Sequence, residues 1–400
     1  MNYKEDFPFL EKGIIYFDNG ATSLKPKSVI KKMNEYYAEY PSNAHRGDYS
    51  ISIKSSSEFE KARETVRSFI NARSTKEIIF TSGSTESLSQ AIYGYFRDKL
   101  NKDDEILTTK AEHASVILPL FDLENKIGVS VKYIPLNKDY TFNIDNLISS
   151  ITDKTKVVCL AEITNVIGDI RNIKEIVSIC HKKGIKVVVD AAQSAGHINI
   201  DVQDSDVDFL AISAHKMLGP NGVGVLYGKE ELLNELDSIK KGGGMTISFD
   251  DSKNIVYKEL PYKLEAGTQN IPGVLGFMEA INYINKVGVD NIEEYTHELK
   301  EYLVLKLKKL NNIEMYNEKV EGSTVVFNVK GVFAQDTAIY LDKHNICVRS
   351  GDHCDKKLKE ELNINNTVRV SLYFYNTKEE IDKLVEVLDN DKILEESLGV

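Results

Sequence analysis

The sequence predicts an α/β protein with a large, mostly parallel sheet, helices on both faces of that sheet, and a smaller α+β unit. Two observations carry this prediction. Short apolar runs alternate with helical patterns as far as about residue 285, and a long charged helix followed by separated strands comes after that point. The chain has 400 residues, of which 42% are hydrophobic and 28% charged, so it is long enough for one large core and a second, smaller one.

The large unit is predicted from alternating strands and helices. Two amphipathic helical patterns come first, at residues 28–40 and 51–71. Seven short apolar runs then indicate buried strands, at residues 77–80, 105–108, 129–134, 156–161, 185–189, 209–213 and 223–227. Helical patterns lie between them at residues 85–100, 115–128 and 173–183. Because strands that alternate with helices form parallel sheets through crossover connections, these runs predict one seven-stranded sheet.

The smaller unit is predicted from the last part of the chain. A charged helical pattern covers residues 291–310, strands are expected at 324–329, 346–349 and 367–372, and helices at 335–344 and 378–388. Strands and helices in this looser order are typical of an α+β unit. We therefore expect a large domain at residues 19–284, and a small domain that combines residues 1–18 with residues 285–400.

Charge and cysteine spacing exclude several classes of function. The formal net charge of −11 argues against a nucleic-acid partner, because acidic surfaces repel phosphate backbones. No run of about 18 apolar residues and no signal-peptide pattern occurs, so we expect a cytoplasmic protein with no membrane association. The four cysteines are widely spaced without a CxxC pair, which argues against a metal site or a disulfide framework.

Lys216 and Asp190 each follow the end of a predicted strand. A lysine amine can condense with the aldehyde of pyridoxal 5'-phosphate to form a Schiff base, and a buried aspartate keeps the pyridine nitrogen protonated so that the ring accepts electrons. The alternative for Asp190 is an N-cap in a strand-to-helix loop. Together the two residues predict pyridoxal 5'-phosphate as the cofactor.

Three further positions suit that cofactor. Ser84 and Thr85 begin a helix after the first strand, where free backbone N–H groups favour a phosphate, although an ordinary helix cap explains them as well. His113 follows another strand and is suited to stack on a planar ring or move a proton; the alternative is a polar loop histidine. Gln193, three residues after the aspartate, is suited to donate a hydrogen bond to the ring oxygen.

Ten motifs in this order resemble the cysteine desulfurases, a branch of the class V aminotransferases that includes selenocysteine lyases and has pyridoxal phosphate fold type I. The resemblance extends from about residue 14 to about residue 390. The motifs are Asp18–Thr22, His45–Gly47, Gly83–Glu86, Glu112–His113, Thr164–Val166, Asp190–Gln193, Ser213–Lys216, Gly242–Met245, Glu265–Asn270 and Arg349–Cys354.

The resemblance implies a role for each cofactor residue. Lys216 would form the Schiff base and move the substrate α-proton, with Asp190 on the pyridine nitrogen. Ser84, Thr85, Ser213 and His215 would hold the phosphate, joined by Thr268 from the other subunit of a homodimer; Gln193 and His113 would contact the ring. Asn165 and Arg369 would bind the substrate carboxylate, Arg369 by a bidentate fork, and Arg349 would orient this region.

The resemblance also implies that Cys354 is the nucleophile of a cysteine desulfurase. Its thiolate would take sulfur from L-cysteine as a persulfide, leave L-alanine, and pass the sulfur to an acceptor protein for iron–sulfur cluster or other sulfur assembly. His353 beside it is expected to assist the thiol. The alternative is a surface cysteine of no consequence. The other three cysteines are expected in the core; they are Cys159, Cys180 and Cys347.

Two carboxylates, Asp352 and Asp355, flank Cys354. Nearby anions disfavour a thiolate unless Lys356, Lys357 or Arg349 compensates, so we expect slow desulfurase chemistry without an acceptor. This leaves other functions open: a selenocysteine lyase acting on L-selenocysteine, a cysteine C–S lyase, an aminotransferase, or a binding protein that keeps only the fold.

Overall fold

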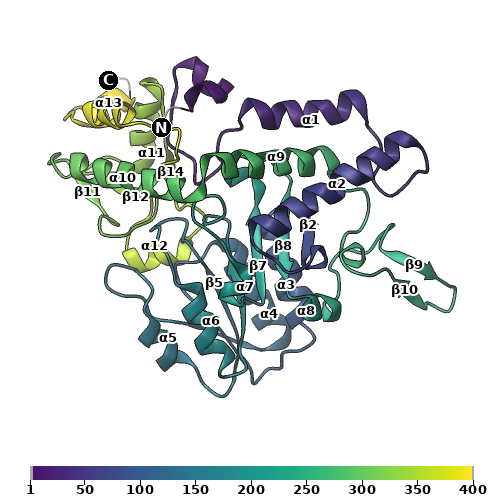
Figure 1. Ribbon diagram of the computed structural model, residues 1–400. Coiled ribbons are helices and arrows are strands. Elements are labelled where there is room, and N and C mark those ends of the chain that lie inside the picture. Colours follow the sequence, from purple (N-terminus) through teal and green to yellow (C-terminus); the bar gives the residue numbers. More distant parts are fainter. Residues whose placement is uncertain (1–2, 399–400) are drawn as a thin grey trace.

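The central element of the computed structural model, which describes residues 3–398, is the predicted seven-stranded sheet (Figure 1). The strands follow the order β2, β8, β7, β6, β5, β3, β4, and only β8 runs antiparallel to its neighbours. Their bounds are β2 Ile78–Thr81, β8 Gly224–Gly228, β7 Phe209–Ser213, β6 Lys186–Asp190, β5 Thr155–Ala161, β3 Glu105–Thr108 and β4 Ser130–Tyr133. The predicted number of strands is confirmed, and each predicted run lies within two residues of its strand.

Burial on both faces explains why these strands appear as apolar runs. In β6, Val187 and Val189 belong to the hydrophobic cluster on one face of the sheet, and Val188 belongs to the cluster on the other. Successive side chains of a strand point to opposite faces, so a strand covered on both sides is apolar at every position. The helices of this unit include α3 Ser84–Ala91, α4 Ala114–Ile127, α5 Ile144–Ser150, α6 Ile173–His181, α7 Val202–Ser205 and α8 Glu230–Glu235.

One long helix of the large unit was not predicted. Helix α9 (Ile271–Val287) lies beside α1 (Lys27–Glu39) and α2 (Ser50–Phe69) (Figure 1). Most of its side chains are buried, so it is apolar on nearly every side and lacks the amphipathic period that marks a surface helix. The helix predicted at residues 85–100 is also shorter, because a π-helical turn, Ile92–Phe96, follows α3.

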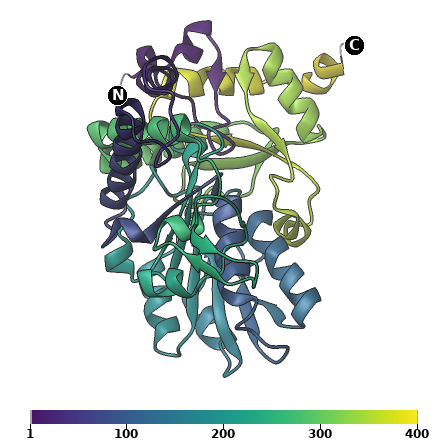
Figure 2. The ribbon, with the colours of Figure 1, turned by 90° about the vertical axis from the view of Figure 1, so that its right-hand side faces the viewer.

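The smaller sheet has four antiparallel strands in the order β11, β12, β15, β14. Figure 2 shows the C-terminal helices, in yellow and light green, above the strands of the large sheet. The predicted strand at 346–349 is divided: β13 pairs with the N-terminal strand β1, and β14 joins the small sheet. The bounds are β1 Ile15–Tyr16, β11 Ile313–Met315, β12 Thr324–Val329, β13 Ile346–Cys347, β14 Arg349–Gly351, β15 Thr367–Ser371, α10 Val289–Leu307, α11 Ala334–Lys343, α12 Lys356–Leu362, α13 Lys378–Leu388 and α14 Ile393–Leu398.

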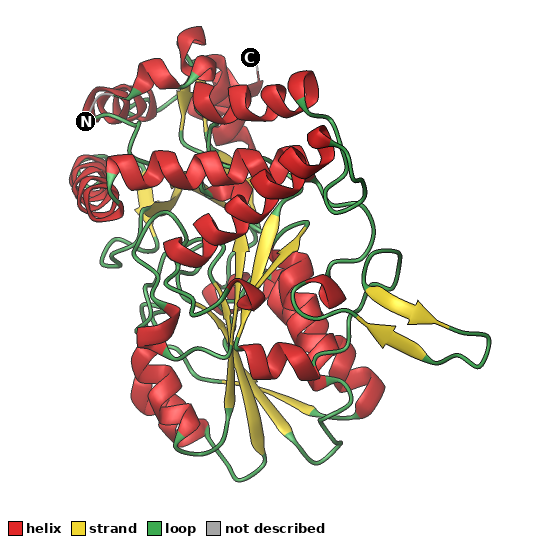
Figure 3. Cartoon of the chain, turned by 45° about the vertical axis from the view of Figure 1, so that its right-hand side comes forward, coloured by secondary structure: helices red, strands yellow, loops and turns green. Residues whose placement is uncertain are grey.

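The N-terminal segment contacts the C-terminal part of the chain. Besides the β1–β13 pairing, Phe7 packs against Phe374 and Tyr375. The division into residues 19–284 and residues 1–18 with 285–400 stays a prediction. A hairpin that was not predicted, β9 (Thr246–Phe249) with β10 (Ile255–Tyr257), projects from the large unit (Figure 3). Among residues 3–398, no helix combines the length and the apolar character needed to span a bilayer.

Candidate active site

A cavity of about 190 Å³ lies at the carboxyl ends of β6 and β7, next to the small sheet. All but two of the predicted site residues line it, although they come from distant parts of the chain. They are Ser84, Thr85, His113, Asn165, Asp190, Gln193, Ser213, His215, Lys216, Arg349 and Arg369. The two that do not line it are Cys354 and Thr268. Parallel strands direct their carboxyl ends to one edge of the sheet, which explains how these residues meet.

Asp190 and Lys216 form the buried charged centre of the cavity. Asp190 ends β6, and Lys216 follows the adjacent strand β7 in a single 3-10 turn. Burial raises the pKa of Asp190, while the Lys216 ammonium counteracts that rise. Burial also lowers the pKa of Lys216 to about 8, and the nearby Arg369 and Arg349 act in the same direction. The lysine amine is therefore neutral, and nucleophilic, in mildly alkaline solution.

The start of α3 forms a polar cradle at one end of the cavity. The Ser84 backbone N–H donates to Ser213 Oγ (3.1 Å), and Thr85 Oγ1 lies 2.8 Å from Ser115 Oγ. Burial lowers the pKa of His215 to about 4, and Lys216 contributes to that decrease, so its imidazole is neutral at physiological pH. Hydroxyls and backbone N–H groups at the positive end of a helix are what a phosphate requires.

His113 caps the N-terminus of α4. Its Nδ1 accepts a hydrogen bond from the Ser115 backbone N–H (3.1 Å). Burial, with a contribution from Lys216, lowers the pKa of His113 to about 4, so the ring is neutral. Since Nδ1 is an acceptor, the ring proton is assigned to Nε2. Gln193, on the loop after β6, donates from Nε2 to the Gly20 carbonyl (2.9 Å).

Arginines from the small sheet form the opposite wall. Arg369 on β15 is fully buried, and burial lowers its pKa to about 10. Its Nη1 donates to the Asn165 carbonyl (2.8 Å) and its Nη2 to Asp18 Oδ1 (3.3 Å). Arg349 lies opposite Arg369 in the antiparallel register of β14 and β15. Two cations beside each other in a small cavity suit a substrate carboxylate.

Cys354 lies on an exposed loop between β14 and α12. Arg349 Nη2 is 3.6 Å from Cys354 Sγ, so one arginine contacts the thiol and lines the cavity. The loop is strained, because His353 and Cys354 both have positive φ angles, 55° and 61°. Two carbonyl oxygens of the loop accept hydrogen bonds from the large unit. Asn165 Nδ2 donates to the His353 carbonyl (2.8 Å), and the Ala114 N–H donates to the Cys354 carbonyl (3.0 Å).

The three acidic and histidine neighbours of Cys354 make contacts that the sequence did not predict. The Asp355 side chain is buried and caps α12 by accepting from the Leu358 N–H (3.1 Å), and burial raises its pKa well above the usual value. Asp352 Oδ1 accepts from the Cys354 backbone N–H (3.0 Å). Burial lowers the pKa of His353 to about 2, and its Nε2 lies 2.9 Å from Thr367 Oγ1. His353 therefore anchors the loop and is too weak a base to assist the thiol.

The remaining predicted residues lie outside the cavity. Thr268 is on an exposed loop, where its Oγ1 accepts from Asn43 Nδ2 (3.3 Å). Cys159 and Cys180 are buried as expected, and burial raises the pKa of Cys180 to about 12, which makes that thiol a poor nucleophile. Cys347 was expected in the core but is half-buried, because it belongs to the short strand β13.

Sequence reasoning did not assign roles to two supporting acids. Asp18 pairs with Arg369, and Glu112 pairs with Arg171 (2.6 Å) at a site where neither side chain is exposed. Glu112 also accepts from the Ala161 N–H at the end of β5 (2.7 Å). Both acids belong to motifs visible in the sequence, but their partners are far away along the chain.

These residues fit pyridoxal 5'-phosphate. A buried carboxylate is costly without a cationic partner, and a protonated pyridine nitrogen supplies one to Asp190. The Lys216 amine, with its lowered pKa, is available to the aldehyde, and the cradle at α3 suits the phosphate. Asn165 Oδ1 is buried without a hydrogen-bond partner among the described residues and is free to contact a bound molecule.

Comparison with known proteins finds one family and several relatives that are named cysteine desulfurases. Residues 15–384 match the family model for Aminotransferase class-V. A probable cysteine desulfurase of Halalkalibacterium halodurans is 41% identical over 97% of both chains, and one of Staphylococcus epidermidis is 39% identical over 97% of this chain and 95% of its own. Among solved structures, the cysteine desulfurase CsdA of Escherichia coli has 32% identity and a TM-score of 0.92, with 98% of each chain covered. A cysteine desulfurase of Thermococcus onnurineus has 36% identity and a TM-score of 0.93, covering 99% of this chain and 98% of that one.

Proposed function

The chain belongs to the class V aminotransferases, which use pyridoxal 5'-phosphate, and on this basis we propose that it is a cysteine desulfurase. The reaction converts L-cysteine to L-alanine and transfers the sulfur to Cys354 as a persulfide. One observation carries the proposal: the exposed Cys354 thiol contacts Arg349, an arginine that also lines the cavity of Lys216. The names and the overall similarity of the relatives support the same activity.

We propose these roles for the residues that hold cofactor and substrate. Asp190 holds the proton on the pyridine nitrogen, and Gln193 and His113 contact the ring. Ser84, Thr85, Ser213 and His215 bind the phosphate, and Thr268 joins them from the second subunit of a homodimer. The exposed position of Thr268, outside the cavity of its own subunit, supports that assignment. When bound, the cofactor supplies an electron sink conjugated to the substrate Cα.

Lys216 and the arginines act on the substrate. Arg369 and Arg349, with Asn165, bind the carboxylate of L-cysteine and orient its Cα–H bond toward Lys216. The neutral Lys216 Nζ takes the α-proton, for which its lowered pKa of about 8 is suitable. Burial of Arg369 among protein groups excludes water from this end of the cavity and strengthens its attraction for the carboxylate.

Sulfur transfer follows from the position of Cys354. Its thiolate, whose Sγ lies 3.6 Å from Arg349 Nη2, bonds to the substrate sulfur as the Cβ–S bond breaks. The electron pair of that bond goes to carbon, which takes up a proton, so carbon is reduced and sulfur is left at the persulfide level. Cysteine and one thiol thus become alanine and one persulfide. Because Cys354 is exposed, the persulfide is accessible to a sulfur-acceptor protein of iron–sulfur or other sulfur assembly.

The experiment that tests this function measures alanine from L-cysteine with a thiol reductant as the sulfur acceptor. The Cys354→Ala variant is expected to lose roughly 100-fold or more of the rate, because the nucleophile is missing. The matched control is Cys347→Ala, which removes a half-buried thiol and is expected to keep the rate. Equal alanine formation in the Cys354→Ala variant would reject the assignment, and pyruvate in place of alanine would indicate a C–S lyase.

A further inference from the structure

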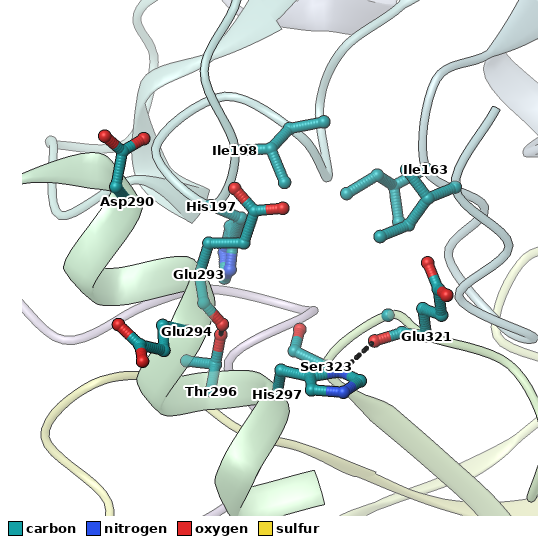
Figure 4. A pocket seen from close by; sticks show the side chains of 12 residues that line it. Ile163, His197, Ile198, Asp290, Glu293, Glu294, Thr296, His297, Glu321 and Ser323 are labelled. Atoms are coloured by element: carbon teal, nitrogen blue, oxygen red, sulfur yellow. Dashed lines mark hydrogen bonds between the residues drawn. The ribbon is translucent and has the colours of Figure 1, made fainter. Parts of the chain in front are cut away.

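A second cavity, of about 380 Å³, lies next to the active site (Figure 4). One wall is the start of α10, with Asp290, Glu293 and Glu294, and the other walls come from Glu321 and from the loops after β5 and β6. The two cavities share Ile163 as a lining residue. We call this space the acidic cavity.

The acidic cavity carries more acidic than basic groups: four carboxylates line it, against His297 in the lining and the nearby Lys300, whose charge interacts with Glu321. Among residues 3–398, no ion pair involves the carboxylates of Glu293, Glu294 or Glu321, whereas Asp290 accepts a hydrogen bond from Asn199. Burial, together with the negative charges of Asp290 and Glu321, raises the pKa of Glu293. Figure 4 shows Glu293 and Glu321 on opposite sides of the cavity. These carboxylates therefore repel one another across the acidic cavity, and a cation bound between them would reduce that repulsion.

A buried polar group at the back of the acidic cavity points independently to a ligand. His197 is only 8% exposed, and its Nδ1 has no hydrogen-bond partner among the described residues. The ring packs against Tyr373 with centroids 4.3 Å apart and the two ring planes tilted by 34°. Burial lowers the pKa of His197 to about 4, so it is a neutral group that can accept or donate one hydrogen bond. A buried ring nitrogen without a partner is destabilising unless a bound molecule reaches it.

The remaining lining determines the kind of cation. Ile163, Ile170 and Ile198 give the acidic cavity apolar lining, and Figure 4 shows Ile163 and Ile198 across the cavity from α10. No group of three or more His, Cys, Asp or Glu side chains within the described range is arranged to hold a metal ion. The volume suits a small molecule or one long side chain. A combination of apolar wall, separated carboxylates and one neutral imidazole matches an aliphatic stem that ends in a cation.

We propose that the acidic cavity binds an organic cation, an alkylguanidinium or alkylammonium group whose stem lies on the isoleucines and whose charge lies between Glu293 and Glu321. The binding site is separate from the positively charged active site, where Arg349 and Arg369 repel a cation. It does not depend on the proposed desulfurase activity, because binding is measured directly on the folded protein.

The test is calorimetric titration of the full chain, loaded with its cofactor, with butylguanidinium. Saturable one-site binding is expected, and it should weaken at least about tenfold in a Glu293→Gln/Glu321→Gln double variant, since charge-assisted hydrogen bonds are lost. The matched control is Glu298→Gln, which lies on the same helix but pairs with Lys378 outside the cavity and should leave affinity unchanged. Butylurea, a neutral molecule of similar shape, should not bind.

The proposal is overturned by any of three results: no saturable binding of butylguanidinium, equal binding of butylurea, or unchanged affinity in the double variant. Because the substituted carboxylates are exposed, the double variant is expected to fold, and its thermal unfolding checks this. Two further ligands distinguish the natural source. Tighter binding of an arginine capped at both ends indicates the side chain of a protein partner, and tighter binding of agmatine indicates a free small amine.

Discussion

Replacement of Asp352 separates two opposite effects of this residue on Cys354. If charge alone governs Cys354, an acid beside the nucleophile disfavours the thiolate, and removing the acid should speed sulfur transfer. In the structure the Asp352 carboxylate positions the loop instead, because its Oδ1 accepts a hydrogen bond from the Cys354 backbone N–H (3.0 Å). We predict that Asp352→Ala slows persulfide formation, whereas Asp352→Asn, which keeps the acceptor oxygen, retains most of the rate.

The magnitude follows from the balance of forces on the loop. Left-handed backbone costs about 1–2 kcal/mol for each of His353 and Cys354, or about 2–4 kcal/mol in all. Three hydrogen bonds oppose it: two neutral ones of about 1 kcal/mol each, and the one to Asp352, which as a bond to a charged group contributes about 1.5–3 kcal/mol. Without Asp352 the remaining bonds no longer offset the strain. A loss of about 1.5 kcal/mol in loop positioning corresponds to a roughly tenfold slower transfer.

The assay is single-turnover persulfide formation with L-cysteine, monitored in parallel with substrate KM. Asp352 does not line the cofactor cavity, so the visible absorbance of the bound cofactor and the KM should stay as in the unchanged protein. If both variants instead react faster, electrostatic repulsion outweighs positioning and the reasoning is refuted. Equal slowing of Asp352→Ala and Asp352→Asn would also contradict it, because the asparagine oxygen preserves the bond.

Three further predictions concern buried charges. Glu265→Gln breaks the buried ion pair with Arg63 (2.6 Å), so the free energy of unfolding measured by urea titration should fall by about 3–5 kcal/mol. The control Glu64→Gln breaks an exposed ion pair and should change the free energy of unfolding by less than about 1 kcal/mol. Equal effects of the two variants would contradict this prediction. The pKa of Lys216 is lowered to about 8, so its unfolded form binds more protons between about pH 8 and 10.5, and the cofactor-free chain should gain stability across this range. Lys216→Met should reduce that gain without abolishing it, because burial also lowers the pKa of Lys25, Lys300 and Lys359 to about 8, and an unchanged slope would refute the contribution of Lys216. Arg369→Lys removes the planar guanidinium that we propose to bind the substrate carboxylate, so KM for L-cysteine should rise about 10- to 100-fold with a smaller effect on kcat. Initial rates measure both, and an unchanged KM would remove Arg369 from the carboxylate site.

The fold was predictable where local pattern and burial agree. The seven strands of the large sheet are apolar because both faces are covered, and Asp190 stands out as the polar residue that ends such a run. Helix α9 was not predictable by the same reasoning, since burial on nearly every side removes its period. The β9–β10 hairpin has exposed apolar residues, such as Ile247 and Phe249, and no buried face that would produce a regular alternation.

The sequence predicted most of the residues that line the cavity, but it did not predict which groups their side chains contact. Motifs identified the residues that line the cavity, because each lies at a strand end or in a loop that the sheet brings together. The direction of a side chain depends on tertiary packing, which spacing does not encode. Asp355 stands next to Cys354 in sequence but turns inward to cap α12, and Asp18 meets Arg369 across most of the chain length. The contact between Asp18 and Arg369 depends on tertiary packing, whereas the Asp355 cap is local and follows an N-cap pattern that the sequence contains.

We propose that Cys354 receives the sulfur of L-cysteine. The most direct measurement exposes the cofactor-loaded protein to L-cysteine labelled with a heavy sulfur isotope, alkylates all thiols, and determines by mass spectrometry which cysteine peptide carries the label. We expect one additional labelled sulfur atom on the Cys354 peptide, and none on the peptides of the buried Cys159 and Cys180. Alanine production without labelled sulfur on Cys354 would contradict it.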